Sequence, residues 1–150
     1  MLFVLLTQLA ACTFSRPFTG PGYDSTRGVT LDSAGEEVVM VLTHARLGDG
    51  RDTFDDNVSS ILDTLEQQPG LIGYSVRIEI LGDDAWTMTV WDEEANVDRF
   101  VRSSRHQTAI HESLSELTDM RFLRKRMPRS EVPVDWEQAL QMLQGQGGGY

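Results

Sequence analysis

Cysteine is almost absent from this 150-residue chain, which contains only Cys12. A single cysteine cannot form an internal disulfide, and it leaves a sulfur-type zinc site without enough ligands. The three histidines also lack a regular metal-ligand spacing, since His106 and His111 do not stand at the i, i+4 positions that align two ligands on one helical face. The sequence therefore predicts no metal site, and Cys12 needs an explanation of its own.

Positive charge is scarce as well. There are 13 Lys and Arg residues against 23 Asp and Glu residues, for a formal net charge of −10. Nucleic-acid binding needs clustered cations that neutralise phosphates, so DNA and RNA are excluded as expected partners. The hydrophobic content of 40% suits one modest globular domain with an apolar core and excludes disorder as the main state.

The first apolar run, residues 1–11, carries no charge and is shorter than the roughly 20 residues of a membrane-spanning helix. Cys12 follows directly, and Leu9-Ala10-Ala11-Cys12 resembles the lipobox of a bacterial lipoprotein signal. The resemblance implies that the signal peptide 1–11 is removed, that Cys12 is lipidated, and that the protein is membrane-anchored in the cell envelope, facing the periplasm. A frayed apolar tail or a buried structural cysteine is the alternative interpretation.

Residues 12–35 are rich in Ser, Thr, Gly and Pro and show neither helical nor strand periodicity. This composition predicts a flexible tether or a wrapping arm. The domain itself is expected over residues 36–127. A C-terminal extension, residues 128–150, is expected to hold a short helix begun by Asp135 and a disordered tail.

The pattern of residues 36–127 predicts the order strand, helix, strand, strand, helix, strand. Residues 38–45 form a continuous apolar, β-branched run, which is typical of a strand covered on both faces. Residues 71–81 and 85–91 alternate in polarity, and the turn Gly82-Asp83-Asp84 between them predicts an antiparallel hairpin. Residues 120–127 fit a fourth strand at an edge.

Two helices are expected between these strands. The first begins at Asp52 or Thr53 and ends at Pro69-Gly70. The second begins at Asp92 and is interrupted at Ser103-Ser104. Its second part carries His106 on an apolar face.

This order predicts an α+β fold of the ferredoxin-like split βαβ type, with a four-stranded antiparallel sheet and helices on one face. The other face of such a sheet is expected to be bare. Apolar sheet faces are commonly buried against a partner, so we expect a homodimer joined around Tyr74, Val76, Trp86 and Met88.

Three segments carry a family resemblance: TMTVW at residues 87–91, FVRSSRHQTAIH at residues 100–111 and QPGLIGYS at residues 68–75. With the element order, they resemble the antibiotic-biosynthesis-monooxygenase-like family of dimeric α+β barrels. That superfamily includes cofactor-free quinol oxygenases, haem-degrading enzymes and proteins without known activity, so the resemblance speaks for the fold more than for the chemistry. Haem binding or degradation is the weaker candidate, because Phe100 stands at the Trp position of that branch and the first strand offers His44 but no Asn.

His106 and His44 are the candidate catalytic residues, because imidazole can take a phenolic proton near neutral pH. For both, a hydrogen-bonded, half-buried structural histidine is the alternative. Candidate substrate-binding residues are those that could line a cavity for a planar molecule: Tyr74, Trp86, Trp91, Phe100 and Arg77. Residues of these types are more often core or interface.

From the resemblance we expect a monooxygenase-like protein that acts, without a cofactor, on a phenolic, quinol or other conjugated small molecule. The alternative is a non-catalytic envelope lipoprotein that binds a hydrophobic ligand or another protein.

Overall fold

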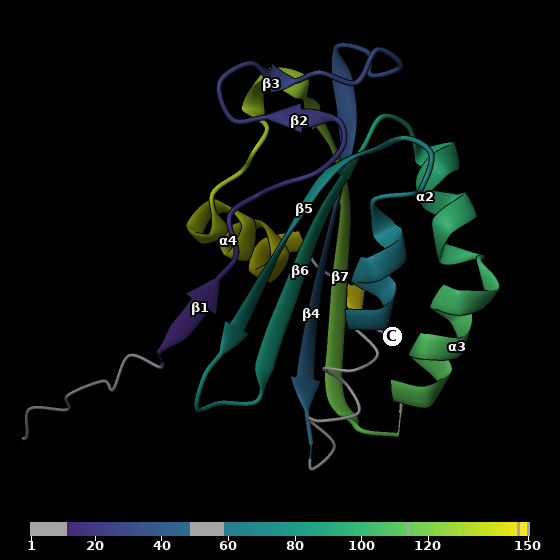
Figure 1. Ribbon diagram of the computed structural model, residues 1–150. Helices are drawn as coiled ribbons and strands as arrows, with labels where there is room; N and C mark the ends of the chain where they lie inside the picture. The colour runs from purple at the N-terminus through teal and green to yellow at the C-terminus, as the bar shows by residue number, and fades with distance from the viewer. Residues whose placement is uncertain (1–11, 49–58, 114, 147, 150) are drawn as a thin grey trace, which may run out of the picture.

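The computed structural model describes residues 12–48, 59–113, 115–146 and 148–149. Its centre is an antiparallel sheet in the order β1-β5-β6-β4-β7-β8 (Figure 1). The strands are β1 (Thr13–Ser15), β4 (Glu37–Leu47), β5 (Leu71–Glu79), β6 (Asp84–Trp91), β7 (Leu117–Pro128) and β8 (Gly148–Gly149), and a small separate hairpin is made by β2 (Tyr23–Asp24) and β3 (Gly28–Val29). The four long strands, in the order β5-β6-β4-β7, confirm the predicted ferredoxin-like arrangement.

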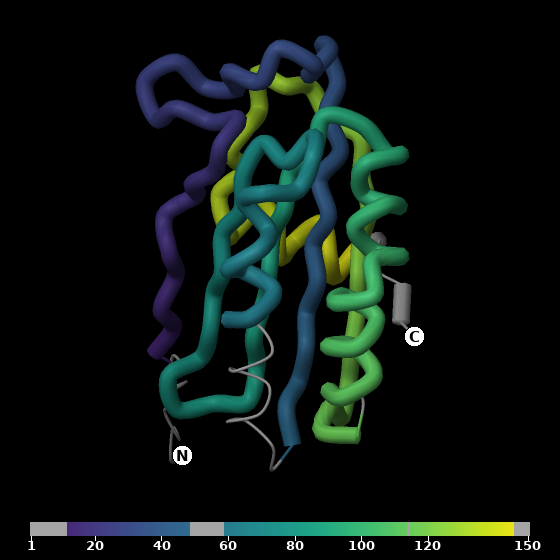
Figure 2. Tube along the Cα trace, turned by 45° about the vertical axis from the view of Figure 1, so that its right-hand side comes forward, coloured from purple at the N-terminus to yellow at the C-terminus, as the bar shows by residue number. Residues whose placement is uncertain are grey.

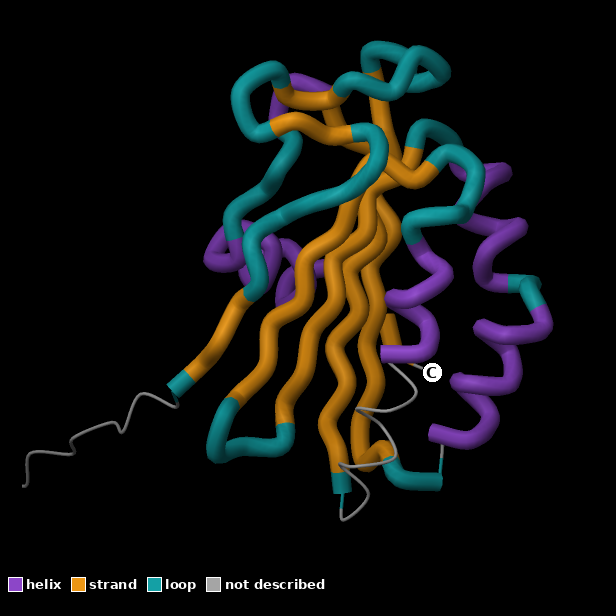
Figure 3. Tube along the Cα trace, viewed as in Figure 1, coloured by secondary structure: helices purple, strands orange, loops and turns teal. Residues whose placement is uncertain are grey.

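Helices lie on both sides of the sheet (Figure 3). On one side are residues 59–65, α2 (Glu94–Val101) and α3 (Ser104–Ser113), and we call this the helical face. On the other side is α4 (Trp136–Gln146), which follows a short 3₁₀ turn, η1 (Arg129–Glu131). The predicted interruption at Ser103-Ser104 is confirmed as the junction of α2 and α3.

The beginnings of the two predicted helices have different outcomes. Asp52 and Thr53 lie outside the described residues. Asp92 is not the N-cap of α2, because Glu93 occupies that position without a side-chain cap hydrogen bond. The Asp92 carboxylate instead accepts hydrogen bonds from Asn96 Nδ2 at 2.8 Å and from Ser33 Oγ at 2.6 Å, so it ties the N-terminal arm to α2.

Strand alternation divides the core between the two faces of the sheet. In β4, Val39 and Val41 point to the helical face and pack in a cluster with Trp91. Val38 and Met40 point the other way, into a larger cluster. This confirms that the β4 strand is covered on both faces.

The expectation of a bare second face is wrong, because α4 and the N-terminal arm cover it. Ala139 and Leu143 of α4 are buried in the cluster on that face. The buried hydroxyl of Ser75 joins the two covering segments, since it accepts a hydrogen bond from Trp136 Nε1 at 3.0 Å and donates one to the Arg16 carbonyl at 2.7 Å. We call this side of the sheet the α4 face.

Of the two alternatives for residues 12–35, a flexible tether or a wrapping arm, the structure shows the wrapping arm. β1 pairs with β5, and Thr19 bridges to Tyr74, so the arm runs alongside β5 (Figure 2). Further along the arm, Val29 and Ala34 are buried, and their carbonyls accept hydrogen bonds from the Arg129 guanidinium at 2.7 and 2.9 Å. Backbone pairing and apolar burial together hold the arm on the domain.

The C-terminal extension contains the predicted short helix, and Asp135 caps it by accepting a hydrogen bond from the Gln138 N–H at 2.9 Å. In the tail that was expected to be disordered, Gly148 and Gly149 pair with β7.

The four residues predicted to form a dimer interface do not share a face of the sheet. Tyr74 and Val76 pair with Thr89 and Thr87 and point to the helical face. Trp86 and Met88 pair with His44 and Leu42 of β4 and point to the α4 face. The predicted interface is therefore corrected, and the homodimer stays a prediction.

Candidate functional site

A cavity of about 300 Å³ lies between the helical face of the sheet and its helices. Its walls are mostly apolar. They come from the four long strands, from the helical residues 59–65 and from α2 and α3, and they include Val41, Leu65, Val76, Ile78, Ala85, Trp91, Phe100, Ala109, Ile110 and Met120. This volume is at the lower end of the range typical of small-ligand sites.

His106 is the histidine among the residues that line this cavity, and α3 positions it there. Its ring meets Phe100 edge-on at 4.7 Å between centroids. Its Nδ1 atom is buried and has no hydrogen-bond partner. Burial lowers the pKa of His106, and a hydrogen bond with the Val101 backbone raises it by a smaller amount. The net shift is downward, which favours the neutral imidazole at pH 7.

Two other polar side chains that border the cavity, those of Trp91 and Arg124, already have hydrogen-bond partners. The indole N–H of Trp91 donates to Thr89 Oγ1 at 2.9 Å. Arg124 donates to the Asp98 carboxylate at 2.7 Å, and this ion pair lowers the pKa of Asp98. His106 thus offers an unsatisfied nitrogen atom within a largely apolar enclosure.

Of the predicted substrate-binding residues, Trp91 and Phe100 line the cavity and contact each other, with ring centroids 5.2 Å apart. Tyr74 packs against the same apolar cluster and donates a hydrogen bond to Glu66 Oε1 at 3.1 Å. Burial, together with the Glu66 carboxylate, raises the pKa of the Tyr74 hydroxyl. The structure therefore brings these three aromatic residues to one side of the sheet.

His44 lies on the α4 face, so the structure does not bring it together with His106. Its Nε2 is 2.6 Å from Asp84 Oδ1, and its ring stacks on Trp86 at 5.1 Å between centroids. Burial alone would raise the pKa of Asp84, but hydrogen bonds from Arg46 and His44 hold it below its ordinary value. His44 is thus part of a hydrogen-bonded cluster outside the cavity.

The remaining two predicted residues, Trp86 and Arg77, are neighbours in the pairing of β5 with β6. Trp86 borders the cavity, but its indole stacks on His44 on the α4 face. Arg77 donates from Nη2 to Thr13 Oγ1 at 3.0 Å, and its buried Nε has no partner. Neither residue contacts His106 in any interaction that the structure records.

Several residues that line the cavity were not among the predicted site residues, notably Ala109, Ile110 and Ser113 on α3 and Ile61 and Leu65 in the helical residues 59–65. Ile110 and Ser113 follow His106 at i+4 and i+7, so the helical period was the signal that could have found them.

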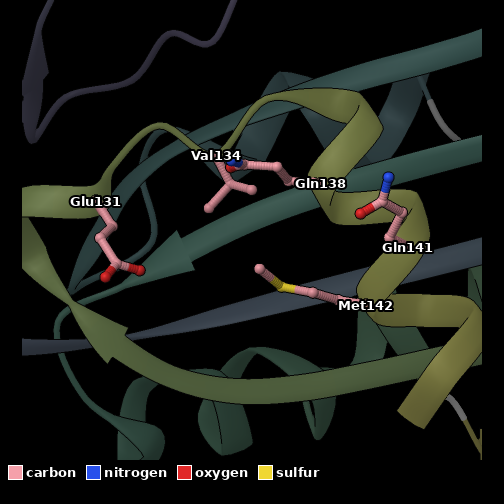
Figure 4. Close-up of a pocket in the computed structure, with 5 residues that line it drawn as sticks. All are labelled: Glu131, Val134, Gln138, Gln141 and Met142. Carbon is pink, nitrogen blue, oxygen red and sulfur yellow. The ribbon is translucent and has the colours of Figure 1, made fainter.

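A second hollow, of about 470 Å³, lies on the outer side of the molecule between η1 and α4 (Figure 4). Its walls are Glu131, Val134, Gln138, Gln141 and Met142. None of these five residues is a histidine or an aromatic residue, so the cavity at the helical face is the better candidate site.

Among the described residues, no group of three or more His, Cys, Asp or Glu side chains could hold a metal ion. No helix in the described ranges is long and apolar enough to cross a membrane.

Residues 38–112, half of the chain, match the sequence profile of the antibiotic biosynthesis monooxygenase family. The chain belongs to this family. The match begins in β4 and ends in α3, so it covers three strands of the sheet and the helices that enclose the cavity.

Several solved structures share the fold of this chain. A Lactobacillus acidophilus protein provisionally assigned as a monooxygenase superposes with a TM-score of 0.53 at 16% identity, over 64% of this chain and 49% of that one. The chain thus spans about half the length of that protein. A conserved Methanosarcina mazei protein gives 0.54 at 15% identity, over 62% and 93% of the two chains. A Mycobacterium tuberculosis protein gives 0.54 at 13% identity, over 65% and 96%. No curated protein sequence matches the chain.

Proposed function

We propose that this protein is a monooxygenase-like enzyme that oxidises a small phenolic, quinol or other conjugated compound with O₂ inside the cavity of the helical face. The observation that supports the proposal is the buried His106 imidazole, whose Nδ1 has no partner within an apolar enclosure and whose burial lowers its pKa and favours the neutral form. A neutral imidazole with a free nitrogen can accept a proton, and an apolar cavity favours planar ligands.

The reaction balances for a phenol. His106 takes the hydroxyl proton and leaves a phenolate, whose electron-rich ring carbon forms a bond with one oxygen atom of O₂. Loss of the ring C–H proton and cleavage of the O–O bond then convert that carbon to a carbonyl. The second oxygen atom leaves as water with the two protons, one of which His106 returns. The substrate is thereby oxidised to a quinone and O₂ is reduced.

Trp91 and Phe100 would hold the substrate ring in this scheme. Their rings contact each other, and Phe100 also contacts the His106 ring edge-on. A planar substrate that packs on Phe100 would therefore lie next to the imidazole. His44 has no part in this scheme, because it lies on the α4 face with Asp84.

The test is oxygen uptake by the purified full chain across a panel of hydroquinones and polycyclic phenols. We expect turnover with at least one compound, and we expect His106→Ala to lower kcat about 10²- to 10⁴-fold, the usual contribution of a general base. His111→Ala is the matched control, because His111 is exposed on the same helix. It should leave the rate unchanged.

Binding without turnover would favour the alternative function, a non-catalytic protein that carries a hydrophobic ligand. Quenching of tryptophan fluorescence by the same compounds measures binding, because Trp91 lies in the cavity wall. Quenching without oxygen uptake would therefore indicate a ligand carrier. If no compound turns over, or if His106→Ala and His111→Ala have equal rates, the enzymatic proposal is overturned.

A further inference from the structure

Three large hydrophobic side chains are exposed at one end of the molecule. Leu81 is 91% exposed, Ile80 is 53% exposed and Phe14 is 53% exposed. Ile80 and Leu81 form the turn between β5 and β6, and Phe14 lies in β1, which Figure 1 shows beside that hairpin. We call these three residues the apolar end. Contiguous exposed apolar side chains mark surfaces that contact another phase or another molecule.

The apolar end lies directly beside the point where residues 1–11 join the domain. The Ile80 N–H donates a hydrogen bond to the Cys12 carbonyl at 2.9 Å, and Phe14 pairs with Ile78. No spacer therefore separates residues 1–11 from the β5–β6 turn. Those eleven residues are uncharged and mostly apolar, with the sequence MLFVLLTQLAA.

We propose that the apolar end is a membrane-contact surface, on which the domain rests against the lipid bilayer. Its occupant is lipid because the neighbouring segment of the chain is itself lipophilic, whether residues 1–11 are retained or are replaced by acyl chains on Cys12. Asp83, exposed in the same turn, disfavours a strongly anionic headgroup surface. The surface therefore suits zwitterionic lipid.

Contact between the apolar end and the bilayer would set the orientation of the domain relative to the membrane. The β2–β3 hairpin and the beginning of α2 lie at the opposite end from the β5–β6 turn and would face away from the membrane (Figure 1). Ile78 and Ala85, which flank the turn, also line the cavity, so this end of the cavity would be nearest the bilayer. The inference goes beyond the proposed oxidation and does not depend on it.

The experiment places a tryptophan at the apolar end. The full chain carrying Leu81→Trp is purified in detergent and reconstituted into phosphatidylcholine vesicles, with or without bromine on the acyl chains. We expect the brominated lipid to quench the added emission about twofold, since interfacial apolar side chains lie roughly 5–10 Å into the headgroup and acyl boundary. Phe14→Trp, which exchanges one aromatic residue for another, should be quenched as well.

Ala95→Trp is the matched control, because Ala95 is exposed on α2 at the opposite end. Brominated lipid should leave its emission unchanged. The wild-type spectrum, from Trp86, Trp91 and Trp136, is subtracted in each case. If Leu81→Trp and Phe14→Trp are quenched no more than Ala95→Trp, the proposal is overturned. A blue-shifted emission that bromine does not affect also overturns it, because protein rather than lipid would then cover the surface.

Discussion

At the scale of single residues, the two histidines predicted as candidate catalytic residues have opposite surroundings. His44 is paired with Asp84 and stacked on Trp86, whereas the Nδ1 of His106 is buried without a partner. Strand alternation points the His44 side chain to the α4 face, and the helical period points His106 into the cavity. Only His106 combines burial in the cavity with free hydrogen-bonding capacity.

The buried His106 should make stability depend on pH. Because burial lowers its pKa in the folded chain, the unfolded chain binds more protons at this site once the pH falls below about 6.5. The free energy of unfolding should therefore decrease as the pH drops through this window. Urea denaturation at pH 7.5 and at pH 5 measures the decrease, and we expect it to be smaller in His106→Phe, which has no titrating group.

The corresponding control is His111→Phe, since the His111 side chain is exposed. Its loss of stability between the two pH values should equal that of the wild type. An unchanged pH dependence in His106→Phe would contradict the burial of a neutral imidazole.

At the scale of elements, a close backbone approach decides how the N-terminal arm docks on the sheet. A Cβ on Gly20 would collide with the backbone of Ile72 and Gly73 in β5. The arm can therefore lie this close to β5 only where glycine stands. A Cβ on Gly35, by contrast, would meet nothing nearer than the Glu37 carbonyl at 3.9 Å.

Gly20→Ala should therefore loosen the arm, at a cost of about 1–3 kcal/mol in stability, the usual penalty of overpacking. Limited trypsin digestion reports the change, because Arg27 is exposed in the arm and would become cleavable in an undocked segment. Gly35→Ala should be cleaved as slowly as the wild type. Equal cleavage of the two variants would show that the close approach does not hold the arm.

At the scale of the whole molecule, α4 covers the sheet face that was expected to be bare. The cluster under it includes Met40, Leu42, Met88 and Leu123, and Leu143 of α4 is buried against them. Apolar area removed from water contributes roughly 25 cal/mol per Å², so exposing this face would favour self-association. A homodimer through this face would require α4 to leave it.

Leu143→Asp should undock α4, because a charge at this buried position costs stability on the order of several kcal/mol. We expect light scattering at tens of micromolar to give a higher mean mass for this variant than for the wild type. Gln144→Asp introduces the same charge at the next, exposed position, so its mass should match the wild type. Equal masses for the two variants would mean that α4 does not shield the sheet.

The sequence by itself determined the order of the four long strands and of the helices between them, the pairing of β5 with β6 as a hairpin and the break between α2 and α3, because periodicity and turn chemistry are local. It also indicated His106, through the apolar face of α3. Only the tertiary structure decided that α4 and the arm cover the second face, since burial of that face depends on contacts between residues far apart in the chain, such as Trp136 with Ser75. The tertiary structure also decided that His44 and His106 lie on different faces of the sheet, because the face to which a strand residue points is fixed by its register with neighbouring strands.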